Sequence, residues 1–255
     1  MTLLDGLVLG IIEGITEFLP ISSTGHLILA GKLLSIPDSD FYKTFEIAIQ
    51  LGAILSVVVL YWKSFLDLEI VKRLVVAFIP TGVIGLLLHG VVKKYLLGNE
   101  LVVLGALLLG GIVLIVFERF YRGKETVQSM HAITYKQAVF MGFFQSLAIV
   151  PGVSRSAATI VGGLLTSGMN RTTIVEFSFL LAVPTMFAAT GLDLVKNASV
   201  FSNANLGILS VGFITSFLVA LCGITFLLGY VRKHSFTAFG VYRIVIALLF
   251  LLFIR

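Results

Sequence analysis

Long apolar runs constrain the fold of this chain more than any other feature. A helix needs about 20 mostly apolar residues to cross the roughly 30 Å hydrocarbon core of a bilayer. Six runs approach or exceed that length, at residues 45–62, 73–92, 100–120, 172–194, 205–230 and 237–254. We therefore predict an all-α integral membrane protein with six transmembrane helices.

Composition agrees with a membrane protein and excludes several other classes. Hydrophobic residues make up 58% of the chain, the mean hydropathy is +1.08, and charged residues are only 12%, about half of the roughly 25% usual in soluble domains. We expect a single membrane domain over residues 1–255. The single cysteine, Cys222, excludes an internal disulfide and a thiolate metal cluster. The basic residues are scattered, which argues against nucleic-acid binding, and residues 1–6 lack the basic segment of a cleaved signal peptide.

Two further apolar segments, at about 3–35 and 137–167, are interrupted in the middle by proline and polar residues. Each arm is about 15 residues long, which corresponds to roughly 23 Å of helix. That length is too short to cross the bilayer. We predict two re-entrant helix hairpins, which a membrane tolerates only where the broken backbone is buried in protein or lines a wet cavity.

The two broken segments resemble each other, which indicates an internal repeat. A shift of 132 residues aligns their polar positions: Glu13 with Gln145, Ser22 with Ser154, Ser23 with Arg155 and Thr24 with Ser156. We predict two units, at about 1–120 and 133–255, each a hairpin followed by three spans. Because three is odd, the second unit would have inverted topology. The hairpin tips would then meet near the membrane midplane, where inverted-repeat membrane proteins place their sites.

The distribution of basic residues predicts the orientation. Loops at 63–73, 119–136, 171 and 232–233 carry ten lysines and arginines, whereas the opposite loops carry six. The positive-inside rule places the first set in the cytoplasm. The first hairpin would then enter the membrane from the outer side.

The first polar cluster contains a pair of carboxylates. Glu13 and Glu17 are spaced i, i+4, so they share one helix face. Charges at membrane depth are a functional-site hypothesis by default, and two carboxylates in a poorly solvated place repel each other. They need a proton, an arginine or a cation between them. We predict a divalent metal, Mg²⁺ or Ca²⁺, held by Glu13 and Glu17, because hard cations prefer such oxygen ligands.

The same cluster offers candidate nucleophiles. A serine needs a nearby base to become nucleophilic, and both Glu17 and His26 could serve Ser23. We predict Glu17, Ser23 and His26 as catalytic residues. Ser22 and Thr24 follow a proline, so they would either cap the next helix or bind substrate.

The second cluster contributes a guanidinium. The fork of Arg155 suits phosphate oxygens, so we predict it as a fourth catalytic residue; the alternative is a structural pair with Glu13 or Glu17. Other polar residues here could offer hydroxyls, an amide or helix N-terminal amides to an anion. The predicted substrate-binding residues are Ser22, Thr24, Gln145, Ser154, Ser156 and Thr159.

The segments from Glu13 to His26 and from Pro151 to Ser156 resemble motifs of the bacterial undecaprenyl pyrophosphate phosphatase family, also called the bacitracin-resistance protein. The resemblance runs over essentially the whole chain. It implies removal of the terminal phosphate from undecaprenyl diphosphate, which recycles the lipid carrier for peptidoglycan synthesis. Bacitracin would be involved only through that shared substrate. The resemblance also implies that the protein lies in the bacterial inner (plasma) membrane, with the site facing the periplasm. Whether the chain forms a homodimer is left undecided by the sequence.

The resemblance carries family roles onto individual residues. It matches the two functional glutamates of the family to Glu13 and Glu17, and the phosphate-binding arginine of the family to Arg155. The nucleophile of the family would be either Ser23 or His26. The phosphatidic acid phosphatases, another class of membrane lipid phosphatase, need a second histidine shortly after a Ser-Arg pair. Here no histidine follows Arg155 until position 234.

A transporter, in its sharpest version a lipid flippase, is the rival interpretation. Inverted repeats, broken helices and intramembrane charges all suit one. A serine–histidine pair beside two glutamates and an arginine exceeds what translocation requires. We therefore expect the hydrolase.

Overall fold

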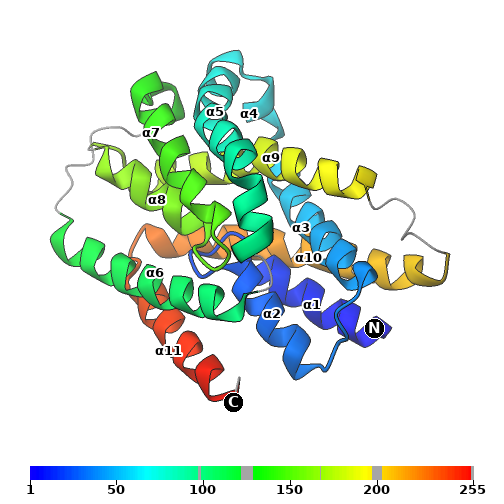
Figure 1. Ribbon diagram of the computed structural model, residues 1–255. Coiled ribbons are helices and arrows are strands. Elements are labelled where there is room, and N and C mark those ends of the chain that lie inside the picture. The colour runs from blue at the N-terminus through cyan, green and yellow to red at the C-terminus, as the bar shows by residue number, and fades with distance from the viewer. Residues whose placement is uncertain (97–98, 122–128, 167, 197–202, 254–255) are drawn as a thin grey trace.

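The computed structural model describes residues 1–96, 99–121, 129–166, 168–196 and 203–253. These residues form helices and contain no strand (Figure 1). The α-helices are α1 (Leu3–Thr16), α2 (Ser23–Leu33), α3 (Asp40–Leu60), α4 (Trp62–Leu66), α5 (Leu68–Val91), α6 (Glu100–Phe120), α7 (Tyr135–Ser146), α8 (Arg155–Leu165), α9 (Arg171–Lys196), α10 (Asn203–Val231) and α11 (Thr237–Phe253). Short helical turns are η1 (Val92–Leu96), η2 (Met130–Ala132) and η3 (Leu147–Ile149).

Five helices of the described part are long and apolar enough to cross a membrane, which identifies a multi-pass membrane protein. These stretches are Asp40–Leu60, Leu68–Leu88, Glu100–Phe120, Arg171–Gly191 and Asn205–Val231. A sixth, Thr237–Leu252, is apolar but shorter. Whether it also crosses the membrane stays a prediction, as do the re-entrant hairpins.

Both broken segments consist of two helices joined by a tip. In the first, α1 and α2 are joined by residues 17–22, and in the second, α7 and α8 are joined by residues 147–154. The bounds of α2 and α8 differ by 132 residues at both ends. The last tip residues, Ser22 and Ser154, have φ of 71° and 73°. This left-handed backbone costs roughly 1–3 kcal/mol at a residue with a Cβ and persists only where the surroundings hold it. The matched geometry supports the predicted repeat.

Helices of the two predicted units pack reciprocally. Helix α1 of the first unit lies against α10 of the second, and α7 of the second lies against α5 of the first. Gly10 and Gly14 of α1 allow this approach, since an added Cβ would lie 2.6 Å from the Gly212 carbonyl oxygen and 2.7 Å from that of Ser216. Helices α3 and α9 contact each other, and α6 lies beside α11, as Figure 1 shows. Small residues thus bring the backbones into direct contact.

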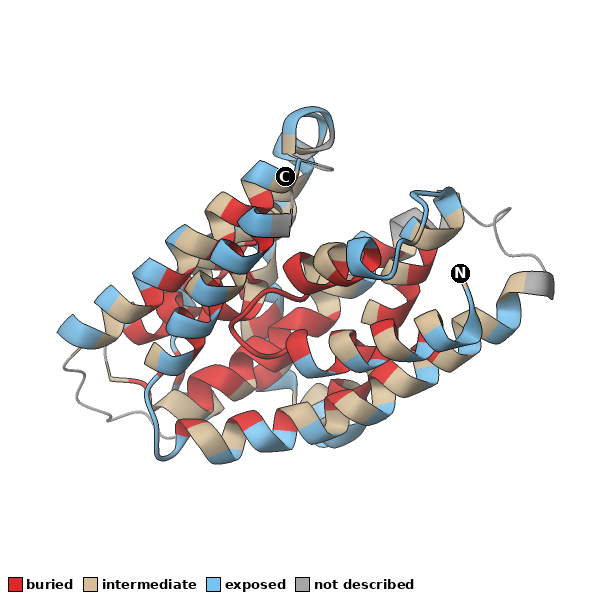
Figure 2. Cartoon of the chain, turned by 90° about the horizontal axis from the view of Figure 1, so that it is seen from below, coloured by how far each residue is buried: buried red, intermediate tan, exposed pale blue. Residues whose placement is uncertain are grey.

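Several polar side chains of the two broken segments are buried. Figure 2 shows the buried residues at the centre of the molecule, whereas the outer faces of the helices are exposed or partly exposed. Those outer faces are apolar: Leu86 and Leu87, for example, are 79% and 76% exposed. Such a surface suits lipid, and it leaves Glu13, Glu17 and Ser23 buried at the centre.

Candidate active site

The two tips are in contact at the centre of the molecule. The Ser156 hydroxyl donates a hydrogen bond to the Phe18 carbonyl oxygen at 2.7 Å. Nη2 of Arg155 donates to Oε1 of Glu17 at 3.1 Å. These contacts join residues 138 positions apart, so the first tip meets the start of α8; the position of this contact at the membrane midplane stays a prediction.

Glu17 lies between a hydroxyl and a guanidinium. Ser23 Oγ donates to Glu17 Oε2 at 2.6 Å, while Glu17 Oε1 accepts from Arg155. The side chains of Glu17 and Arg155 are only 6% and 9% exposed, so little water screens their charges. A carboxylate within hydrogen-bond reach of a serine hydroxyl has the geometry of a base beside its nucleophile. The structure therefore brings together three of the four predicted catalytic residues.

The fourth, His26, has both ring nitrogens occupied by other groups. Nδ1 lies 2.8 Å from the Ser22 carbonyl oxygen, and Nε2 lies 2.8 Å from the hydroxyl of Tyr242 in α11. A carbonyl only accepts, so Nδ1 carries the proton, and Nε2 of the neutral ring accepts from the tyrosine. The hydroxyl of Ser23 is committed to Glu17. Of the two bases left open by the sequence, the geometry favours Glu17. Tyr242 is a site residue that the sequence analysis missed.

One N–H group of Arg155 has no hydrogen-bond partner among the described residues. Its Nη1 donates to the Ser178 carbonyl oxygen at 3.1 Å, and its Nε is buried without a partner among the described residues. Arg155 is also the first residue of α8, where unpaired backbone amides favour an anion. An unpaired guanidinium donor beside a helix N-terminus suits a phosphate oxygen.

Glu13 is the most exceptional carboxyl group of the site. It is fully buried, and within the described part of the chain no N–H or hydroxyl group donates to either of its oxygens, although the Glu17 carboxyl lies within reach of a shared proton. Its charged neighbours are Glu17, Glu46 and Arg155. Three carboxyl groups outnumber one guanidinium, so the cluster needs a proton or a cation.

Glu13 and Glu17 have the right donors for Mg²⁺ or Ca²⁺, which take carboxylate oxygens. Among the residues that the structure describes, no three His, Cys, Asp or Glu side chains lie close enough to hold a metal by themselves. An ion at Glu13 and Glu17 would complete its coordination with water or phosphate oxygens, as Mg²⁺ does in many phosphoryl-transfer sites. The residues present therefore fit the predicted ion.

The remaining predicted site residues mostly have partners within the protein. Ser22 and Ser154 cap α2 and α8 by accepting from the amides of Gly25 and Ala157. Thr159 donates to the Arg155 carbonyl oxygen at 2.9 Å. The side-chain amide of Gln145 donates to Thr81 and Thr185 at 3.0 and 2.9 Å, and Thr24 is half-buried in the first turn of α2. Substrate binding by these residues stays a prediction.

Comparison with known proteins decides the family. The sequence model described as bacitracin resistance protein BacA matches residues 6–249, which include both tips and α11 as far as Leu249. The chain belongs to the BacA family. It is 51% identical over 254 residues to an undecaprenyl-diphosphatase of Aquifex aeolicus, covering 99% of both chains. It is 50% identical over 253 residues to one of Sulfurihydrogenibium sp. (strain YO3AOP1), again covering 99% of both. The resemblance stated from the motifs is confirmed.

Arg243 of α11 is a second residue of this BacA-family chain that the sequence analysis missed. It is completely buried, and it donates to carbonyl oxygens of both tips, namely Pro20 at 3.3 Å, Gly152 at 2.9 Å and Val153 at 2.9 Å. It also donates to Ala106 and Leu107 of α6. One side chain thus ties both tips to α6. The available signal was a lone charged residue in an apolar run.

Proposed function

We propose that this BacA-family chain hydrolyses undecaprenyl diphosphate to undecaprenyl phosphate and inorganic phosphate, and so recycles the lipid carrier for peptidoglycan synthesis. Relatives named undecaprenyl-diphosphatase are about half identical to it over nearly their whole length. The observation that carries the proposal is the array of Ser23, Glu17 and Arg155 where the tips meet. Bacitracin resistance would follow from turnover of the shared substrate.

The proposed reaction begins at Ser23. Its Oγ attacks the terminal phosphorus, and its proton passes to Glu17 Oε2, 2.6 Å away. The bond from that phosphorus to the bridging oxygen breaks, so undecaprenyl phosphate leaves with the electron pair. Water then attacks the phosphoserine and loses a proton to solvent. Glu17 returns its proton to the serine oxygen, and inorganic phosphate is released.

Arg155 stabilises the charge of the transferring phosphoryl group. Its unpaired, buried Nε offers a donor, and donors fixed in a dry site need no reorganisation as charge develops. Its pair with Glu17 also fixes the carboxylate that faces Ser23. A divalent ion, held by Glu13 and Glu17, would neutralise part of the diphosphate charge when bound.

His26 positions the leaving phosphate in this proposal. Tyr242 donates to its Nε2, and the two rings stack in parallel planes, with centroids 5.5 Å apart. Since the Ser22 carbonyl accepts from Nδ1, the ring is held at both nitrogens. To donate to a phosphate oxygen, Nε2 would have to take up a proton and exchange the Tyr242 hydroxyl for the phosphate, while the Ser22 carbonyl keeps the ring in place.

We also propose the finer architecture: six spans and two re-entrant hairpins in an inverted repeat, in the bacterial inner membrane, with the site facing the periplasm. The equal spacing of α2 and α8 and the reciprocal packing support the repeat. The excess of basic residues supports the orientation. Single cysteines at Ser35 and Lys233, placed in a Cys222→Ser background, should label from opposite sides of intact cells. Labelling of both from one side would contradict the orientation.

Phosphate release from undecaprenyl diphosphate by the purified chain is the test of the activity. We expect one phosphate per lipid molecule and multiple turnovers. The rival flippase predicts lipid movement across vesicles without release of phosphate. That outcome would replace the hydrolase by a transporter.

A further inference from the structure

A second concentration of charge lies away from the tips, at the end of α10. A polar hollow of about 470 Å³ lies between the start of α9 and the loop from α10 to α11. Its cationic and titratable lining residues are Arg171, Arg232, Lys233 and His234. Basic pockets at a membrane surface attract anionic lipid headgroups.

Buried contacts fix the walls of this hollow. The Arg171 guanidinium donates to both oxygens of the Glu118 carboxylate. The same carboxylate accepts from the backbone amide of Phe236 at 2.9 Å. One wall comes from α9 and the other from the loop before α11, so Glu118 joins them. On the loop side, the His234 ring stacks on Tyr230 with centroids 4.6 Å apart.

The charge of the loop is available to an anion. Within the described part of the chain, neither Arg232 nor Lys233 forms a salt bridge with a carboxylate. Arg232 interacts through charge with Glu176 at longer range. Both basic side chains are exposed, whereas the carboxylate of Glu118, which joins the two walls, is buried and already committed to Arg171.

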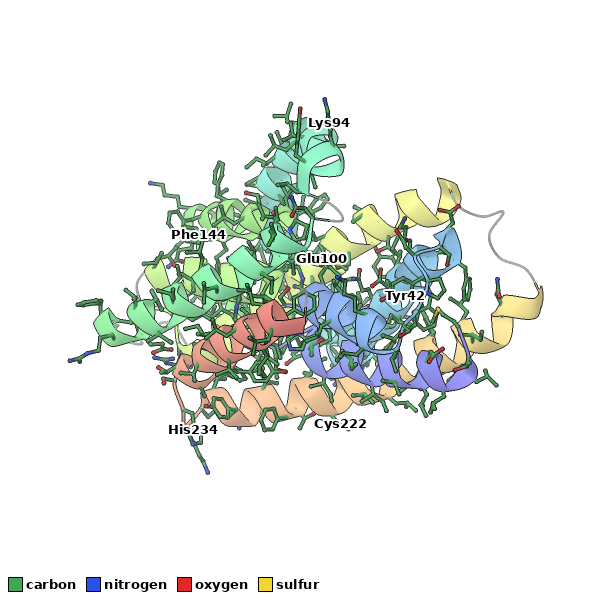
Figure 3. The ribbon with its side chains drawn as sticks, turned by 60° about the horizontal axis from the view of Figure 1, so that its bottom comes forward. Tyr42, Lys94, Glu100, Phe144, Cys222 and His234 are labelled. Carbon is green, nitrogen blue, oxygen red and sulfur yellow. The ribbon has the colours of Figure 1, made fainter. Side chains whose placement is uncertain are left out.

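Two apolar grooves adjoin the polar hollow. One, of about 750 Å³, runs along α10 from Leu221 to Tyr230 and reaches His234 in the loop that follows, and its lining surface is almost entirely apolar. The other, of about 460 Å³, lies between α10 and Tyr61 and reaches Arg232. Thr225 and Gly229 line both grooves. Figure 3 shows Cys222, on α10, and His234, in the loop that follows α10, along one edge of the molecule.

We propose that this end of α10 binds an anionic phospholipid, with its phosphate against Arg232, Lys233 and His234 and one acyl chain in each groove. The hollow shares His234 with the first groove and Arg232 with the second. A polar hollow that shares lining residues with two open apolar grooves matches a lipid with two chains, and the positive lining matches a negative headgroup. The site is separate from the Ser23 centre and does not depend on the proposed reaction.

Three variants of the full chain test the lipid site. The double variant Arg232→Gln with Lys233→Gln removes two charges. The loss of each charge should weaken lipid binding roughly fivefold. Lys63→Gln with Lys136→Gln removes two exposed lysines elsewhere and should change nothing. Gly229→Phe keeps every charge but fills the grooves, and since a Cβ at Gly229 meets nothing within 4 Å, the variant should fold. Unchanged phosphate release in detergent would verify that each variant is folded.

Binding is measured by native mass spectrometry of the purified protein with phosphatidylglycerol or phosphatidylcholine of identical chains. We expect phosphatidylglycerol to be retained about tenfold more than phosphatidylcholine, and to be lost from the charge variant and from Gly229→Phe. Equal retention of both lipids, or retention unchanged in the charge variant, would overturn the proposal. Displacement of phosphatidylglycerol by millimolar inorganic phosphate would assign a free-anion site instead. Preferential displacement by undecaprenyl phosphate would assign a product site.

Discussion

At the tip between α1 and α2 the last residue is Ser22, and at the tip between α7 and α8 it is Ser154. Both have the same left-handed backbone, and both cap the helix that follows. Their neighbours differ in chemistry. Next to Ser22 comes the hydroxyl of Ser23, whereas next to Ser154 comes the guanidinium of Arg155.

The same contrast holds one helix earlier. Glu13 is buried with two unpartnered oxygens, whereas its counterpart Gln145 donates to Thr81 and Thr185. The amide nitrogen of Gln145 is satisfied by two threonines, and its Oε1, although also buried without a partner, carries no charge. A buried carboxylate without a donor has a greater need for a proton or a cation. One tip backbone, used twice, thus supplies an acid and a nucleophile on one side and a cation on the other.

The largest expected effect is at Ser23. Ser23→Ala removes the nucleophile, so kcat should fall by about 10³-fold or more, as measured by phosphate release. Ser156→Ala, in the first turn of α8, removes a hydroxyl that donates to the Phe18 carbonyl and should cost far less. If Ser23→Ala keeps more than about a tenth of the rate while His26→Ala is inactive, the nucleophile is His26 or water.

Arg155 tests the opposite side of the comparison. Arg155→Ala should lower kcat on the order of 10²-fold, the usual effect of losing one preorganised donor, with a smaller change in KM. Arg155→Lys should restore little, because an ammonium lacks the fork. Arg119→Lys, at the exposed C-terminal end of α6, is the control and should keep full activity. Full activity of Arg155→Lys would show that the forked geometry of the guanidinium is not required for the reaction.

Glu13 sharpens the contrast with Gln145. Glu13→Gln should abolish the response to Mg²⁺ or Ca²⁺ and lower the rate about tenfold to 10²-fold, because the ion loses a charged ligand. Calcium binding by calorimetry gives a readout independent of turnover. Full wild-type activity in excess chelator, with metal content verified, would show that Arg155 and a shared proton neutralise the carboxylates instead.

Arg243 joins the two tips, so its loss should loosen both. Arg243→Lys keeps the charge but cannot reach carbonyls on both tips and α6 at once. We expect kcat to fall about tenfold and thermal stability in detergent to drop, because buried carbonyls lose donors. A cross-link between cysteines at the tips should also form more slowly. Unchanged cross-linking would limit Arg243 to a packing role.

The smallest expected effect is at Tyr242. Tyr242→Phe keeps the ring that stacks on His26 but removes the hydroxyl 2.8 Å from Nε2. The rate should fall less than tenfold, and its pH profile should move because the imidazole loses a donor. Tyr230→Phe, far along α10, is the control. An unchanged pH profile would show that protonation of His26 does not influence the rate of the reaction.

Most of the fold was predictable because apolar runs record burial in lipid. The predicted starts were late where a polar first turn precedes the run. Helix α3 begins at Asp40 rather than 45 because Ser39 accepts from the Tyr42 amide. Helix α5 begins at Leu68 rather than 73 because Asp67 accepts from the amides that follow it. Hydropathy alone does not register such caps.

The site was predictable as far as its chemistry is local in sequence. Glu17 and Ser23 lie six positions apart, and the repeat brought Arg155 to the same centre. Tyr242 and Arg243 were missed because their partners are far away: 216 positions separate Tyr242 from His26, and 223 separate Arg243 from Pro20. A residue whose role depends on tertiary packing leaves only a weak local signal, here one charge in an apolar helix.

The reciprocal packing of α1 on α10 and of α7 on α5 also determines an order of assembly. During synthesis, α1 and α2 enter the membrane long before α10 exists, so the glycine face of α1 has no partner until Gly212 and Ser216 emerge. During that interval the carboxyl groups of Glu13 and Glu17 also lack Arg155, so they must be neutralised by protons or remain in contact with water. We expect a chain truncated before α10 to be cleared by membrane proteases rather than to act as half an enzyme, which a pulse-chase of its lifetime would reveal.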